Sequence, residues 1–305
     1  MYLRWFTVVA LLTAAGVAQA ELLIADSGGD RIMLFDDQTG AVIDANWLTD
    51  IGAVGWFFTT PKEAMLVGSE IWVSDQVADA IHRFDLDRNF LGSVTAHPLG
   101  GVLDNLRGLG FDGTTVYQTV WPSTTTRRGV ARYDTAGTPL GFHALNASLF
   151  DVTPFQGDLL ISNETTDDIE RWTTTGTFVG VFRDNVVYPQ QIAVLADGSV
   201  LTVSSIAASG IEGVYHLNDD GSLRAFIDTE PIEEMVPRSA YLLGNGAYLI
   251  GTSQGVYRAQ FNGVGYDFTL MLGGVDAQYI NYIPEPSTAL LLALAGLAAL
   301  RRNRA

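Results

Sequence analysis

Three cationic side chains occupy matching places in a pattern that recurs along the chain. Lys62 and Arg238 each follow a proline that begins a short apolar run, and Arg107 takes the matching place in a third run. Gln190 follows the proline of a fourth run. Cationic groups that converge can hold a carboxylate or a sulfate, because each forms charge-assisted hydrogen bonds with the anion. If the fold brings the runs together, the sequence predicts an anion-binding site formed by Lys62, Arg107, Gln190 and Arg238.

Two acidic residues beside these positions leave an alternative open. Alignment of the runs on their prolines places six residues at one level, namely Lys62, Arg107, Phe150, Gln190, Arg238 and Ala277. Their neighbours in the sequence are Glu63, Gly108, Asp151, Gln191, Ser239 and Gln278. Glu63 and Asp151 could pair with the cations, in which case the level is structural and binds nothing.

No other group of residues predicts catalysis or a bound metal. The chain has no cysteine, which excludes thiol chemistry, and its four histidines are scattered, without a serine–histidine–aspartate constellation. Acidic clusters such as the one at Asp26–Asp30 lack the spacing of a calcium loop and are typical of β-turns. We therefore predict no catalytic residue, no metal and no cofactor.

The elements that would position these residues are short strands repeated about every 45 residues, the dimension of a propeller blade. The second strands of six such units start at Leu22, Ile71, Val116, Leu159, Val200 and Tyr248. Each is followed by a third strand, by a turn rich in Asp, Thr and Gly, and by a shorter fourth strand. We predict an all-β, six-bladed β-propeller of four-stranded antiparallel blades over residues 21–283.

The two ends of this region complete each other. The run at Leu22 is a second strand with no first strand before it, whereas Tyr279–Ile283 is a first strand with no second strand after it. Pairing of the two would complete a blade and close the ring without a free strand edge. We therefore expect Leu22 and Tyr279 to lie close together.

The repeat resembles that of NHL-type six-bladed propellers, through LLIADSGGDRIMLF from Leu22 and RGLGFDG from Arg107. Gluconolactonase-type propellers are similar in architecture and hold a divalent metal near the channel mouth. Where that family has Pro-Asn-Gly, this chain has Pro189-Gln190-Gln191, and cations stand at other matching positions. Three cations around the place of a metal would oppose its binding electrostatically.

Residues 1–20 are typical of a secretory signal peptide. One positive charge, Arg4, precedes an apolar stretch, and the segment ends in Ala18-Gln19-Ala20, a cleavage site of the small-x-small type before Glu21. A retained N-terminal anchor is the alternative, although the stretch is shorter than the roughly 20 residues of a membrane span. The segment predicts a signal helix and export through Sec-type machinery.

Residues 284–305 resemble a PEP-CTERM sorting segment. The segment consists of Pro284, Glu285 and Pro286, an apolar run at 288–300, and a basic tail with Arg301, Arg302 and Arg304. A helix formed by the apolar run would be about 20 Å long, whereas a bilayer core is about 30 Å thick. This transmembrane helix would therefore anchor the protein in the membrane only transiently. The resemblance implies cleavage by an exosortase-like membrane protease in a Gram-negative bacterium that makes extracellular polymers.

Charge and the two terminal segments bound the function. The net charge is −17 although four arginines lie in the terminal segments, so the body repels phosphate backbones and we predict no nucleic-acid partner. We predict a non-catalytic binding or scaffold module of the cell envelope or extracellular matrix, linked to exopolysaccharide or biofilm. Its partners would be a polysaccharide, a small anion or a surface protein. The alternative is a propeller enzyme, with lactonase- or lyase-like hydrolysis at the channel mouth.

Overall fold

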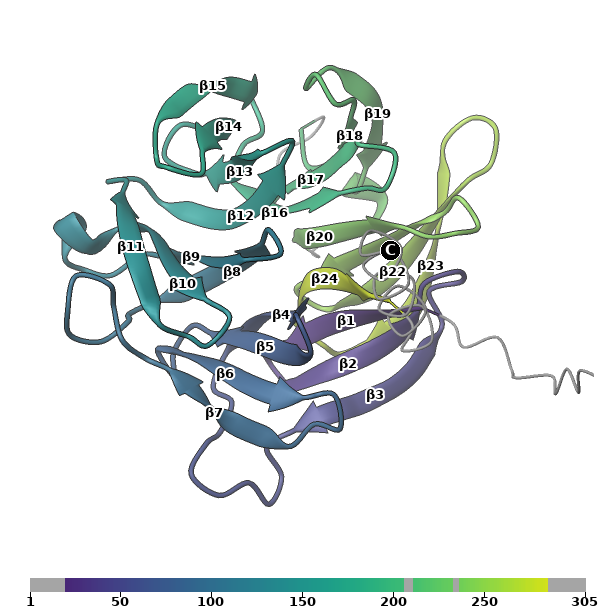
Figure 1. Ribbon diagram of the computed structural model, residues 1–305. Coiled ribbons are helices and arrows are strands. Elements are labelled where there is room, and N and C mark those ends of the chain that lie inside the picture. The colour runs from purple at the N-terminus through teal and green to yellow at the C-terminus, as the bar shows by residue number, and fades with distance from the viewer. Residues whose placement is uncertain (1–19, 206–210, 233–235, 285–305) are drawn as a thin grey trace, which may run out of the picture.

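Six four-stranded antiparallel sheets surround a central axis in the computed structural model, which describes residues 20–205, 211–232 and 236–284 (Figure 1). The sheets are the blades of a propeller, and the predicted fold class is confirmed. Within the described ranges, helical structure is limited to two 3-10 turns, at Thr125–Arg127 and Glu230–Ile232.

Each blade runs outward from the axis through four strands in chain order, except that the blade containing the N-terminus takes its inner strand from the C-terminus. The inner strands are β4 (Pro61–Val67), β8 (Leu106–Phe111), β12 (Leu149–Phe155), β16 (Pro189–Val194), β20 (Pro237–Leu242) and β24 (Ala277–Ile283). The second strands are β1 (Glu21–Asp26), β5 (Glu70–Asp75), β9 (Thr115–Val120), β13 (Asp158–Asn163), β17 (Val200–Ser204) and β21 (Tyr248–Thr252).

The two outer positions of each blade complete the element order. The third strands are β2 (Arg31–Asp36), β6 (Ala80–Asp85), β10 (Gly129–Asp134), β14 (Asp168–Thr173), β18 (Gly213–Leu217) and β22 (Gly255–Phe261). The outermost strands are β3 (Val42–Thr49), β7 (Phe90–Val94), β11 (Pro139–Ala144), β15 (Phe178–Arg183), β19 (Leu223–Asp228) and β23 (Tyr266–Gly273).

The ring is closed by antiparallel pairing of β24 with β1. Leu22 pairs with Tyr282 and Ile24 with Ile280, so the two strands lie side by side in one blade (Figure 1). The expected pairing of the two ends is therefore confirmed. Closure removes a free edge that would otherwise expose unpaired backbone groups to other chains.

The hydrophobic core lies between neighbouring blades. Six clusters of buried apolar side chains are described, one for each junction around the ring. At the junction beside the closure, Leu22 and Met33 of one blade pack with Leu249 and Val256 of the next. The side chains of facing sheets thus interdigitate, as in other sheet-on-sheet packings.

Prolines are confined to positions where the sheet tolerates them. Pro61, Pro189 and Pro237 begin inner strands, and Pro154 lies within β12. An inner strand has a ladder partner on one side only, so a residue without an N–H can face the axis without breaking the sheet. This is why the repeat containing Pro154, whose sequence departs from the others, still forms a complete strand.

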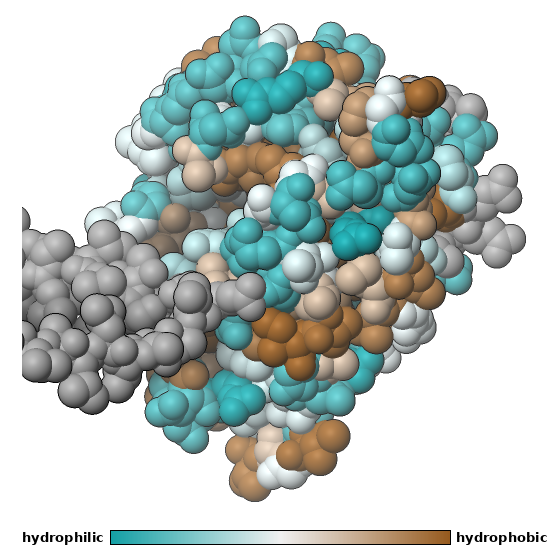
Figure 2. Space-filling view, turned by 90° about the vertical axis from the view of Figure 1, so that its right-hand side faces the viewer, coloured by the Kyte–Doolittle hydropathy of each residue, from teal (hydrophilic) through white to brown (hydrophobic). Residues whose placement is uncertain are grey.

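The outer surface of the ring is mixed in polarity. Figure 2 shows hydrophobic residues interrupted by hydrophilic ones on one side of the ring.

Within the described ranges no helix is long and apolar enough to cross a membrane. The predicted signal helix and C-terminal hydrophobic helix lie outside those ranges, as do Ala18, Glu285, Pro286, Arg301, Arg302 and Arg304.

Candidate functional site

The predicted cations lie at one end of the axis, each as the second residue of its inner strand. We call this the cationic end, and it comprises Lys62, Arg107, Phe150, Gln190, Arg238 and Gln278. The prediction placed Ala277 at this level and was wrong by one residue in β24. Ala277 pairs with Asp26 as Pro61 pairs with Asp75, so Ala277 takes the place of the proline. Gln278 therefore occupies the level, and Tyr279 follows it.

A β-bulge near the start of every inner strand shapes this end. In β4 the pairing passes from Pro61–Asp75 to Glu63–Ser74, so one extra residue is inserted, and the other five inner strands are irregular at the same place. A bulge breaks the alternation of side chains along a strand. As a result the consecutive side chains of Lys62 and Glu63 both reach the inner strand of the adjacent blade, where they bond to Gln278 and Asn281 of β24 respectively.

Hydroxyl groups of neighbouring blades hold the bulged residues in place. Ser74 donates to the carbonyl oxygen of Arg107 (2.6 Å), and Ser162 donates to that of Gln190 (2.5 Å). Ser239 donates to that of Gln278 (2.5 Å), close to Gly251, whose lack of a side chain leaves room for it. These buried bonds fix the backbone from which the side chains of the cationic end extend.

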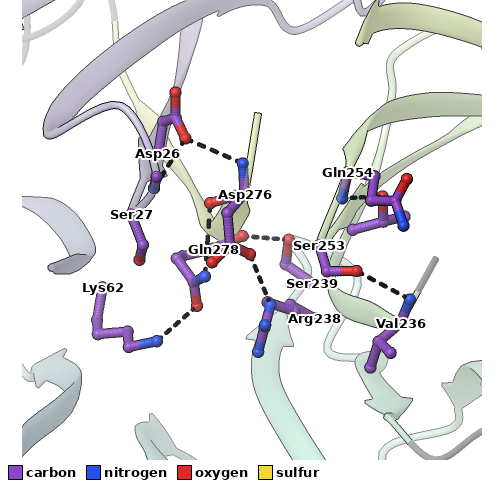
Figure 3. Close-up of polar contacts among 12 residues, drawn as sticks. Asp26, Ser27, Lys62, Val236, Arg238, Ser239, Ser253, Gln254, Asp276 and Gln278 are labelled. Carbon is purple, nitrogen blue, oxygen red and sulfur yellow. Dashed lines mark hydrogen bonds and ion pairs between the residues drawn. The ribbon is translucent and has the colours of Figure 1, made fainter. Parts of the chain in front are cut away.

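Lys62 and Arg238 differ in how their charges are compensated (Figure 3). The Arg238 Nε lies 3.0 Å from Asp276 Oδ1, and this carboxylate forms an ion pair with it. The Lys62 Nζ donates to the neutral side chain of Gln278 (3.1 Å) and has no carboxylate partner among the described residues. Burial, followed by the nearby charge of Arg238, lowers the pKa of Lys62 to about 8.

Arg107 is buried against neutral groups. Its guanidinium lies 4.0 Å from the centre of the Phe150 ring and donates to Ser148 Oγ (3.0 Å) and to the Leu149 carbonyl oxygen (3.1 Å). Burial lowers the pKa of Arg107, because the charged form loses hydration. Its Nε has no hydrogen-bond partner in the described structure, and neither has Nε2 of Gln190. Both side chains are at least nine-tenths buried.

The acidic neighbours do not pair with the cations, contrary to the structural alternative. Glu63 accepts hydrogen bonds from the Leu109 N–H and from Asn281 Nδ2. Asp151 accepts from the N–H groups of Val152 and Ile192, each at 2.7 Å. Burial raises the pKa of both carboxyl groups.

Gly108 makes the position of Asp151 possible. A β-carbon on Gly108 would lie 2.2 Å from Asp151 Oδ1 and 2.6 Å from its Cα. The inner strands β8 and β12 therefore approach each other closely only because one of them carries no side chain at this point.

A hollow lies at the other end of the axis, and sequence reasoning did not find it. This cavity of about 280 Å³ is lined by the later residues of the inner strands. We call it the aromatic end and define it by Glu63, Phe111, Thr153, Tyr241, Asn281 and Tyr282. The rings of Tyr241 and Tyr282 are nearly parallel, 4° apart, with centres separated by 6.3 Å.

Metal-ligating and histidine side chains are not gathered at the axis. No group of three or more His, Asp or Glu residues suited to a metal ion occurs within the described ranges. His82, His143 and His216 lie on third or outermost strands, and His97 lies in a connection.

The tail of the chain matches a known family. Residues 283–305 match the PEP-CTERM protein-sorting motif, so the sorting segment predicted from the sequence is confirmed. The motif indicates an exported protein that is sorted to the cell envelope, and it implies processing by an exosortase, which is a membrane protein.

Solved structures resemble the body of the chain. A protein of unknown function from Bacteroides caccae has a TM-score of 0.59 and 16% identity, covering 88% of this chain and 100% of its own. The nidogen/laminin complex has a TM-score of 0.62 and 14% identity, covering 86% of this chain and 98% of its own. A catalytically inactive virginiamycin B lyase from Staphylococcus aureus with quinupristin has a TM-score of 0.57 and 12% identity, covering 84% of this chain and 86% of its own. At these identities the likeness concerns the fold alone. No curated protein sequence matches the chain.

Proposed function

We propose that this exported, PEP-CTERM-sorted six-bladed propeller is a non-catalytic binding module that captures an anionic group at its cationic end. The group is a carboxylate or a sulfate, carried by a small molecule, a polysaccharide or a surface protein. One observation carries the proposal: the buried donors Arg107 Nε and Gln190 Nε2 have no acceptor in the described structure, and they stand at the same level as Lys62.

The electrostatic balance of this end supports an anion. Asp276 compensates Arg238, whereas Lys62 and Arg107 bond only to neutral groups. A buried charge without a counter-charge is costly, and an incoming carboxylate or sulfate would remove that cost while accepting from the open donors. Two uncompensated cations therefore fit a ligand with one or two negative charges.

The sorting motif supports a place of action outside the cytoplasm. We propose that the mature domain begins at Glu21, ends near Ile283 and acts in the cell envelope or extracellular matrix of a Gram-negative bacterium. An exosortase would act on the tail while the apolar run at 288–300 holds the membrane transiently. The resemblance of the tail supports a link to exopolysaccharide or biofilm, in which an acidic polysaccharide would supply the carboxylate.

Calorimetric titration with glucuronate and with sulfate tests the proposal. Lys62→Met keeps the length of the side chain and removes its charge, and we expect a loss of affinity of about 30-fold or more, equivalent to roughly 2 kcal/mol. Arg224→Gln is the control, because it removes one positive charge from an exposed ion pair with Asp197 on an outer strand. Equal affinity of Lys62→Met and the native protein, or no anion binding by the native protein, would contradict the proposal.

The lactonase- or lyase-like alternative predicts a different outcome. If the cationic end serves hydrolysis by a metal-dependent route, the purified mature domain should contain a stoichiometric divalent ion that chelation removes. Elemental analysis before and after chelation separates this alternative from anion binding.

A further inference from the structure

The aromatic end has the composition of a ligand site but the opposite chemistry to the cationic end. Its cavity is lined by apolar and aromatic side chains together with a few polar ones, and no lysine or arginine is among its lining residues. Small-molecule sites are typically mostly apolar hollows with a small number of polar groups that fix orientation. This hollow is lined by residues of all six inner strands, which surround the axis in Figure 1.

We propose that the aromatic end binds a neutral saccharide, independently of the anion proposed for the cationic end. Tyr241 and Tyr282 offer ring faces against which the apolar face of a sugar ring can pack, and Phe111 adds a third ring to the lining. Tyrosine combines an apolar body with a polar tip, which suits a ligand that is apolar on its faces and hydroxylated at its rim.

The polar groups of the hollow suit hydroxyls rather than charges. Asn281 donates from Nδ2 to Glu63 at 2.8 Å, and its side-chain oxygen accepts no hydrogen bond from the described residues. Thr153 donates to the Ile192 carbonyl oxygen at 2.8 Å, and its hydroxyl oxygen can still accept. A sugar hydroxyl both donates and accepts, so it can bond to each of these atoms.

The charge of the hollow argues against an ionic ligand. The carboxyl group of Glu63 is fully buried, and burial together with the charge of Asp151 raises its pKa well above the ordinary value. Both effects favour the neutral form, so Glu63 attracts a cation less than a solvent-exposed carboxylate would. An anion would meet no basic side chain in the lining, so a neutral ligand is the best match.

The surface beyond the hollow has room for more than one sugar unit. A neighbouring hollow of about 520 Å³ shares Phe111 and Pro154 with the first and continues over β8, β12 and the start of β13. Its lining adds Thr114, Gln156 and Thr174, which carry further hydroxyl and amide groups. The two hollows are thus adjacent and meet at Phe111 and Pro154. We infer that the ligand is an oligosaccharide.

Titration of the mature domain with neutral oligosaccharides of four to six units tests the inference. The probes are a β-1,4-glucan, an α-1,6-glucan and a β-1,4-mannan. Their binding is measured by saturation-transfer NMR and calorimetry. We expect at least one probe to bind, and we expect Tyr282→Ala and Asn281→Ala each to weaken it about tenfold, equivalent to 1.4 kcal/mol. Tyr188→Ala is the matched control, because Tyr188 is a similarly exposed tyrosine that contacts Phe150 at the cationic end.

Two outcomes would overturn the inference. One is that none of the three neutral probes binds, and the other is that Tyr188→Ala weakens binding as much as Tyr282→Ala does. Thermal melting of each variant identifies any loss of fold. Because Lys62→Met should leave oligosaccharide binding unchanged, failure at this end and failure at the cationic end give separate results.

Discussion

The two ends of the axis are formed by the same six strands, yet they differ in charge, in polarity and in how their side chains are held. At the cationic end, bulged residues present Lys62 and Arg107 without carboxylate partners. At the aromatic end, Tyr241 and Tyr282 line a hollow whose one acidic lining residue, Glu63, has a pKa raised by burial. Tyr279 is fully buried, and its phenol group interacts electrostatically with Arg107 of the cationic end and with Glu63 of the aromatic end.

The difference shows how a repeated scaffold separates two chemistries within one channel. Near their first residues the inner strands bulge, and two consecutive side chains reach the axis. Beyond the bulge, residues further along the same strands line the hollow, among them Met65, Thr153 and the consecutive pair Asn281 and Tyr282. Substitutions at one end should therefore leave the other end intact.

Removal of β24 should have the largest effect, because this strand contributes to both ends. A mature chain that stops after Asp276 loses Gln278, Asn281 and Tyr282 together with the closure against β1. We expect a loss of several kcal/mol, comparable to the whole stability of a domain, and an aggregating product. The matched chain that stops after Pro284 removes only the sorting segment and should melt as the native domain does. Circular dichroism and thermal melting distinguish them, and equal stability of the two chains would refute the role of closure.

Much of this architecture can be predicted from the sequence, and the failures have identifiable causes. The unpaired strands at Leu22 and Tyr279 predict closure because strand edges need partners. The level of Lys62 follows from the prolines, but Ala277 replaces the proline in β24, so the alignment slipped by one residue there. A bulge cannot be seen in a pattern of alternating residues, so the contacts of both Lys62 and Glu63 with β24 were not predicted.

The aromatic end could not be predicted because its residues resemble core positions. Phe111, Tyr241 and Tyr282 lie at the ends of apolar runs that are otherwise buried. Nothing in one run shows that three such ends meet. The signal becomes visible only when the closed ring is assumed and residues are counted from the bulge, which places Tyr241, Asn281 and Thr153 at one level. The ion pair of Arg238 with Asp276 was not predicted for the same reason, because the two residues belong to different repeats that only the closed ring brings together.

Lys62→Met should stabilise the protein while it removes anion binding. The native-state pKa of about 8 lies below the ordinary 10.5, so the unfolded chain binds more protons between these values and native stability rises with pH across that window. At pH 7 the buried charge is a cost, and we expect the variant to be more stable by about 1–3 kcal/mol, with a flatter profile from pH 8 to 10. Urea unfolding at several pH values measures this.

The same group should give the two ends different pH profiles. Anion affinity of the native protein should fall severalfold as pH rises through about 8, because Lys62 loses its proton. Oligosaccharide binding should not follow this fall, since Lys62 is not among the residues that line the hollow. Parallel changes at both ends would mean that the two sites are not separate.

Glu63→Gln should produce the smallest effect and locate the boundary between the ends. Burial raises the pKa of Glu63 above its ordinary 4.5, so the native state keeps a proton that the unfolded chain has lost, and stability falls as pH rises above about that value. In the variant the amide oxygen can accept from the Leu109 N–H, and the Asn281 amide can turn to accept from the new NH₂ group. We expect a gain of about 1 kcal/mol at pH 7.5 and a smaller change near pH 5, with a residual slope from Asp151, whose pKa is also raised. Glu63→Ala is the contrast, because it leaves the Leu109 N–H without an acceptor and should destabilise at both pH values. A Glu63→Gln variant whose pH slope equals that of the native protein would mean that Glu63 is charged, and the hollow would then suit a cation better than a neutral sugar.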